Sequence, residues 1–449
     1  MDGVTNHAEH AAAAVLPPDD PRRFPLHQEV HARPPARIRL PALVVYVAVL
    51  NDGVTREQEL AHLQRLPGQG GLTLADLQGN FLRLRCAPGY TLKWERHTEF
   101  SRYSLVQPLS GEAGLGTQEP DLLADLRLPP DWWAGIPGRT ICAIQLALVG
   151  GDLSDPAAVL AQARPWFGQR PVVASLVGRQ AYGLVVTDFA LRDNGFERML
   201  FVAAPHTSET RAGRVSARLL ELETYRMMAL LGLPVAKALS GPIAAAEARL
   251  AELTAQMEAK ATSDQLLLDD LVALAARIER AVAEHGYRFS ATRAYDRIVQ
   301  QRIAELREQA IAGTQTISEF MQRRLSPAMA TVAATEQRLE ALSERIARTG
   351  ALLRTQVDIA REEQNRQLLE KLTRGQALQL RLQSTVEGLS IAAISYYVIS
   401  LVLYGAKALK SAGVPLHPEL TAGALMPLVL WGVWRLTRRI HARLHEGQT

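Results

Sequence analysis

The pattern of hydrophobic and polar positions changes twice along this chain, near residue 207 and near residue 388. Before residue 207, short apolar runs are separated by Gly, Pro, Asn and Asp, a pattern typical of strands joined by turns. From 211 to 383, apolar residues return every three or four positions among Ala, Glu, Arg and Gln, which indicates amphipathic helices. After residue 388 come two apolar runs with almost no charge. The pattern therefore predicts three zones.

The first zone predicts an α+β domain over residues 22–204, preceded by a disordered N-terminus at 1–21. Its elements repeat, and each half follows the order β-α-β-β, which predicts a mixed sheet. The first half contains Ala42–Leu50 (strand), Thr55–Leu66 (helix) and Phe81–Leu105 (hairpin). The second half contains Ile141–Val149 (strand), Asp155–Phe167 (helix), 172–191 (strand pair) and a further strand, Phe196–Val202. Turns are expected at Ala87–Tyr90, at Gly178–Gln180 and at Asp193–Gly195.

The second zone, residues 211–387, predicts long helical arms. We expect a break at His285-Gly286 after a long arm, and a final helix that begins near Thr316 and kinks at Pro327. Five apolar residues of this last helix keep a three-and-four spacing typical of coiled coils. They are Leu339, Leu342, Ile346, Leu353 and Val357. The spacing serves equally for packing within one chain and for packing between two copies.

The third zone predicts a hairpin of two transmembrane helices at 388–409 and 420–436, joined by an external loop at 410–419. A bilayer-crossing helix needs about 20 mostly apolar residues, and the first run meets this length. The second run is shorter, but Arg435 can snorkel to the membrane surface. The alternative is a buried helical hairpin. Against it, both runs are apolar on every face and end in basic residues. We expect no other long apolar run before residue 388, so this hairpin would be the membrane anchor.

The tail at 437–449 is basic, and arginines also end the second run, which places this end in the cytoplasm under the positive-inside rule. Two spans then return the N-terminal body to the same side. The first 21 residues lack the basic and apolar regions of a signal peptide. The two cysteines form no disulfide framework. The formal net charge of +4 suits an anionic lipid bilayer better than nucleic acid, which is not expected as a partner.

Two polar clusters are candidates for ligand binding. The segment LHQEVHARP carries Glu29, His31 and Arg33, but it lacks the H-E-x-x-H spacing of a zinc helix, so we expect docking rather than a metal site. In WERHTEF, a continuous strand would place Glu95, His97 and Glu99 on one face. Two carboxylates beside a histidine can bind a ligand or perform acid–base catalysis. They can equally pair with arginines of the HARP segment or elsewhere in the chain, since charged cross-strand pairs on a half-exposed sheet need no catalysis.

The signature motifs of common enzymes are absent. The sequence contains no Walker loop, G-x-G-x-x-G, G-x-S-x-G, C-x-x-C or kinase motifs, so no cofactor is expected and catalysis is not favoured. One further string, ETYRMMALL at 223–231, interrupts an apolar helix face with Glu223, Tyr225 and Arg226. We expect these side chains to form a polar network with the sheet.

A set of ordered motifs resembles an uncharacterised bacterial family of membrane-anchored proteins that carry a domain of unknown function. The motifs are EVHARP (29–34), WERHTEF (94–100), ETYRMMALL (223–231), RFSATRAY (288–295), QTISEF (315–320), RLSPAM (324–329) and QLRLQSTVEGLSIAAISYY (379–397). The resemblance runs from about residue 22 to about residue 440. It implies a membrane anchor in a bacterial cytoplasmic (inner) membrane, and it brings no substrate or catalytic residue.

The layout is also similar to that of CorA-type magnesium channels. That family carries Gly-Met-Asn after its first span, whereas this chain reads Tyr404-Gly405-Ala406-Lys407. Positive charge at Lys407 opposes cation entry. Three functions remain open: a scaffold or regulatory protein, a CorA-like channel, and a membrane-tethered enzyme that uses Glu95, His97 and Glu99. We expect a homo-oligomer through Leu339–Ser395, because small residues in the first span permit close helix approach.

Overall fold

The computed structural model describes residues 20–23, 37–87, 89–260, 262–413, 415 and 417–445. It divides into two compact units. The first comprises Met1–Glu258 and Asp270–Arg348, and the second Ala259–Asp269 and Thr349–Thr449. The sheet and the first part of the helical zone therefore share one unit, although the sequence predicts a boundary between residues 204 and 211.

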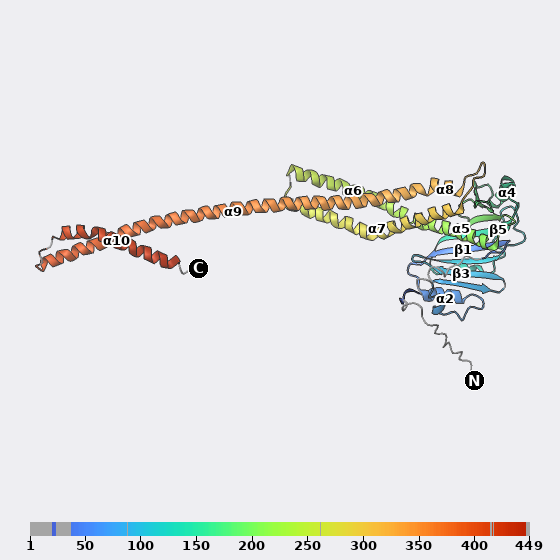
Figure 1. The fold of residues 1–449 in the computed structure, drawn as a ribbon, viewed down its shortest axis with the longest axis horizontal. Coiled ribbons are helices and arrows are strands. Elements are labelled where there is room, and N and C mark those ends of the chain that lie inside the picture. The colour runs from blue at the N-terminus through green and yellow to red at the C-terminus, as the bar shows by residue number, and fades with distance from the viewer. Residues whose placement is uncertain are drawn as a thin grey trace, which may run out of the picture. The chain divides into compact units, whose positions relative to one another are not determined.

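The first unit contains a mixed sheet of eight strands. Figure 1 shows this sheet with α5 (Glu209–Leu230) beside it. Its strands are β1 (Ala42–Leu50), β2 (Phe81–Cys86), β3 (Tyr90–Arg96), β4 (Phe100–Pro108), β5 (Arg139–Gly150), β6 (Val173–Val177), β7 (Gly183–Thr187) and β8 (Glu197–Ala203). Their order across the sheet is β2-β3-β4-β1-β5-β8-β7-β6. The predicted α+β class with a mixed sheet is confirmed.

The strand order shows the internal repeat. Outward from the central β1–β5 pair, each half places its first strand, then its fourth, its third and its second. Each half contains four strands and one early helix, so the first half has one strand more than predicted. The extra strand arises because the segment Phe81–Leu105 turns twice. The halves also differ in direction: β4 pairs antiparallel with β1, whereas β8 pairs parallel with β5.

Helices cover both faces of the sheet. Consistent with this, β1 has apolar side chains on both of its sides. Val44 and Tyr46 belong to a core cluster with α5 (Glu209–Leu230), the end of α7 (Asp264–Leu306) and α8 (Ile317–Arg324). Val45 and Val47 belong to the opposite cluster. That side carries α2 (Arg56–Gln64), η1 (Leu74–Leu77), α3 (Pro130–Ala134), α4 (Pro156–Ala163) and η2 (Arg164–Phe167). Strand alternation thus builds two cores from one strand.

The long helices break at other places than predicted. α6 (Gly232–Ala259) ends before α7 begins at Asp264, and α7 then runs unbroken through His285-Gly286. A glycine inside a helix costs only about 1 kcal/mol, which side-chain packing offsets. Pro327 does not kink a continuous helix, because α8 ends at Arg324 and a new helix, α9 (Ser326–Ser411), starts beside it. Proline is tolerated in a first helical turn.

The apolar stripe of α9 is buried inside the first unit over its first part. Leu339, Leu342 and Ile346 are at most 3% exposed. Beside them, Arg338 Nη2 lies 2.7 Å from Glu247 Oε2 of α6. This part of the stripe therefore packs against helices of the same chain, the intrachain alternative that the spacing left open.

Three helical stretches are long and apolar enough to cross a membrane: Glu209–Ala259, Ile317–Ser411 and Pro418–Thr437. The last lies in α10 (Pro418–His445). The two C-terminal stretches are almost wholly exposed in their apolar windows, whereas a third of the first window is buried. The expectation that no long apolar run precedes residue 388 is wrong. Ala and Leu residues that pack α5 and α6 into the first unit supply that extra run.

Candidate functional site

Glu95, His97 and Glu99 do not share a strand face, so that prediction is wrong. β3 ends at Arg96 and β4 begins at Phe100, which leaves His97 and Glu99 in the turn between them. The His97 amide donates to the Phe100 carbonyl at 2.8 Å, and Asn51 Nδ2 donates to the His97 carbonyl at 3.0 Å. These bonds close the β3–β4 hairpin at a turn. The side chains of Glu95, His97 and Glu99 therefore lie in different surroundings, one on the strand and two in the turn.

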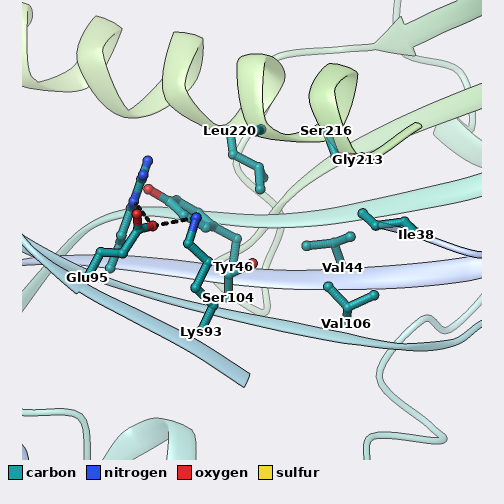
Figure 2. A pocket seen from close by; sticks show the side chains of 12 residues that line it. Ile38, Val44, Tyr46, Lys93, Glu95, Ser104, Val106, Gly213, Ser216 and Leu220 are labelled. Atoms are coloured by element: carbon teal, nitrogen blue, oxygen red, sulfur yellow. Dashed lines mark hydrogen bonds and ion pairs between the residues drawn. The ribbon is translucent and has the colours of Figure 1, made fainter. Parts of the chain in front are cut away.

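Glu95 lies in a buried ion cluster under α5 (Figure 2). Its Oε2 atom lies 2.5 Å from Arg102 Nε of the paired strand and 2.8 Å from Lys93 Nζ. Burial alone would raise the pKa of this carboxyl, but the two cations overcome burial and lower the pKa from 4.5 to about 2. The adjoining cavity of about 40 Å³ holds little more than water. Glu95 therefore belongs to a structural ion network.

The same network reaches two helices. Arg102 Nη1 lies 3.4 Å from Glu221 of α5, and Glu221 accepts from Arg302 of α7 at 2.7 Å. Arg302 also pairs with Glu305 at 3.0 Å. Alternating charges thus join β3, β4, α5 and α7. Glu95 and Arg102 form the buried end of this chain, where removing one partner is costly because the other charge is left uncompensated.

Glu99 binds α7 instead. Arg288 pairs with Glu99 Oε1, and Tyr295 Oη donates to Glu99 Oε2 at 2.7 Å. Burial, and then the Glu99 carboxylate, raise the pKa of the Tyr295 hydroxyl. The motif RFSATRAY therefore supplies the partners of the motif WERHTEF, as the arginine-pairing alternative predicted.

His97 borders a cavity of about 540 Å³ beside the turn of the β3–β4 hairpin. The cavity is mostly polar, and its lining residues are Arg56, Asn80, Arg96, His97, Thr98, Phe100, Tyr225, Tyr295 and Ile298. The His97 ring stacks on Phe100 at 4.5 Å, and Arg96 is held by Glu59 at 2.5 Å. Of Glu95, His97 and Glu99, His97 is the residue that lines a ligand-sized space.

A second cavity, of about 740 Å³, is lined in part by Arg226 and by Glu197, a residue that the sequence analysis did not single out. Arg226 pairs with Glu223 on α5 and lies 3.6 Å from Glu197 on β8. Burial and the neighbouring Glu223 raise the pKa of Glu197 to about 9, so this carboxyl stays protonated at neutral pH. The expected polar network between ETYRMMALL and the sheet is confirmed. The signal missed was Glu197 itself, a carboxylate at the start of a strand that is apolar from Met199 onward.

The other predicted ligand residues, His31 and Arg33, lie outside the described residues. Glu29 does also. The docking role expected for their segment therefore stays a prediction.

Fold and sites together define an α+β protein with several polar cavities and with C-terminal helices apolar enough to cross a membrane. The chain belongs to the family described as "Protein of unknown function (DUF3422)", whose model matches residues 18–444. The resemblance stated from the motifs is thereby confirmed at the level of the family. No curated protein matches the chain.

Proposed function

We propose that this protein is a membrane-anchored scaffold or regulatory protein of a bacterial cytoplasmic membrane, with its body and both termini in the cytoplasm. The observation that carries the proposal is the exposure of large apolar side chains along the C-terminal helices. Leu389, Tyr397, Leu401, Leu420 and Leu428 are each more than 60% exposed. Burying one leucine side chain fully is worth about 1.5–3 kcal/mol, so a row of them strongly favours lipid.

A regulatory role is favoured over catalysis by the state of the predicted acid–base residues. Glu95 and Glu99 are both engaged with arginines, and each also accepts from a second partner. A carboxylate held in this way is a poor proton acceptor, because its pKa lies far below neutral pH in the case of Glu95. The cavity beside His97 is better suited to binding a polar ligand.

Self-association is the second part of the proposal, and its partner is another copy of this chain. The sequence analysis expected the contact between copies along Leu339–Ser395. The apolar stripe of α9 up to Ile346, however, is covered by the chain's own helices. Ser390, Ala392 and Ala393 are exposed on α9. Small residues on an apolar helix permit close backbone approach in lipid. We therefore propose that the contact lies on the exposed part of α9.

Membrane fractionation tests the anchor. The full chain should stay in the membrane pellet after high-salt and alkaline washes, and should be extracted by detergent. A chain ending at Glu387 should appear in the supernatant, although the stretch Glu209–Ala259 is retained. Recovery of the shortened chain in washed membranes would show that α5 and α6 contribute an anchor and would overturn this layout.

A cysteine-accessibility assay tests the orientation. A single cysteine after Arg435 should react with a membrane-impermeant maleimide only after the cells are opened. Labelling of intact spheroplasts from outside would place the basic tail on the other side and would contradict the proposed topology.

A further inference from the structure

A third cavity, of about 280 Å³, is lined mainly by arginines. Its lining residues are Gly178, Arg179, Tyr182, Arg211, Arg214, Arg218, Glu305 and Arg307. Five guanidinium groups face one carboxylate, which leaves an excess of four positive charges. This cavity shares no lining residue with those beside His97 and Glu197.

The single carboxylate in the cavity is already used. Glu305 Oε2 lies 3.1 Å from Arg218 Nε, and Arg302 also pairs with Glu305 at 3.0 Å. Among the described residues, none of Arg179, Arg211, Arg214 and Arg307 forms an ion pair. Like charges gathered without counter-charges repel one another, and an anion between them removes that repulsion.

Three elements bring the arginines together. Arg211, Arg214 and Arg218 follow one another at spacings of three and four on α5, which places them on one helix face. Arg179 comes from the β6–β7 turn. Arg307 follows the last residue of α7, with φ at 50°.

The floor of the cavity is held in place by hydrogen bonds. The Gly178 amide donates to the Leu306 carbonyl at 2.8 Å, and Gln309 Nε2 donates to the carbonyls of Gly178 and Arg179 at 2.9 and 3.2 Å. These bonds tie the β6–β7 turn to the end of α7. Gly178 has φ at 84°, and a side chain there would collide with the Tyr182 ring.

The wall formed by Tyr182 is also fixed. Its carbonyl accepts from Thr207 Oγ1 at 2.6 Å, and the guanidinium of Arg211 lies 4.8 Å from the centre of its ring. A guanidinium stacked on an aromatic face keeps its N–H groups free to bind an anion. The cavity is therefore preorganised, with its positive charges already in place.

We propose that this arginine cavity binds a phosphate-bearing ligand with two or more phosphate groups. Guanidinium groups match phosphate oxygens through paired N–H donors. A terminal phosphate carries about −1.5 to −2 charges at neutral pH, so two such groups balance the excess of four. A volume of about 280 Å³ suits a small ligand. The phosphates belong either to a soluble compound or to a lipid headgroup. This inference is independent of the proposed membrane function.

The test is calorimetric titration of the full chain in phosphatidylcholine nanodiscs with two probes. Tripolyphosphate represents the soluble source, and water-soluble dihexanoyl phosphatidylinositol 4,5-bisphosphate represents a headgroup with more than one phosphate. The variant Arg179→Gln with Arg214→Gln removes two exposed cations that form no ion pair among the described residues, so the fold is preserved. The matched control is Arg277→Gln with Arg280→Gln on an exposed part of α7.

We expect wild-type protein and the control to bind tripolyphosphate equally, and the cavity variant to bind at least about tenfold more weakly. Binding of dihexanoyl phosphatidylinositol 4,5-bisphosphate alone, with the same loss in the cavity variant, would assign the site to a lipid headgroup. The proposal is overturned if neither probe binds wild-type protein. It is also overturned if the cavity variant binds like wild type, or if the control loses affinity equally.

Discussion

The ion cluster around Glu95 allows one prediction to be worked out from the structure. The change is Glu95→Gln, which keeps the shape of the side chain and removes its charge. Glu95 is 1% exposed, so its carboxylate and the Arg102 guanidinium interact with little screening by water. After the change, the one ion-pair partner left to Arg102 among the described residues is Glu221, at 3.4 Å. An uncompensated buried arginine should lower the free energy of unfolding.

The pKa of Glu95 supplies the magnitude. Lowering the pKa from 4.5 to about 2 corresponds to about 3 kcal/mol of stability, at about 1.4 kcal/mol per unit. Because the folded pKa lies below the unfolded one, this stability is present above pH 4.5 and is lost as the pH falls toward 2. Removing one partner of a buried ion pair costs about 3–5 kcal/mol, which agrees.

Urea unfolding of the full chain in detergent micelles, followed by near-ultraviolet circular dichroism, measures the effect. Buried Trp94 and Trp166 report on the first unit. Wild type should exceed Glu95→Gln by about 3 kcal/mol at pH 7, and this difference should vanish near pH 2. A difference below about 1 kcal/mol at pH 7, or one that persists at pH 2, would refute the reasoning, because the carboxylate charge would then not be the stabilising element.

Three further predictions follow from other sites. Wild type should lose stability as the pH rises from 4.5 toward 9, because the folded Glu197 carboxyl keeps its proton to a higher pH than the unfolded one. Glu197→Gln should abolish this loss. Infrared spectroscopy of the carboxyl stretch should show the proton leaving wild type near pH 9. Glu99→Gln should lower the free energy of unfolding by about 1–3 kcal/mol, since Arg288 loses its buried partner, and unchanged urea midpoints would contradict the pairing. In a cysteine-free background, a cysteine at Ala393 should crosslink between copies in native membranes while one at Leu342 should not, and the absence of both crosslinks would favour a monomer.

Local patterns were sufficient to predict most elements of the first unit. The strand at Ala42–Leu50 has the predicted bounds, and glycine turns follow β2 and β6 as expected. These features depend on residues near one another in the chain, so spacing and turn chemistry reveal them. The unbroken α7 shows the limit of that reasoning, because packing overrides the weak helix preference of His285-Gly286.

The sequence by itself determined the α+β class, the mixed sheet, the apolar C-terminal helices and the membership of the family. Only the tertiary structure decided which polar residues meet. Glu99 and Arg288 are 189 positions apart, and the arginine cavity draws on three elements. Such contacts depend on strand order and on how the helices cover the sheet. Periodicity records which face of an element is buried, but it carries no information about which distant side chain lies opposite.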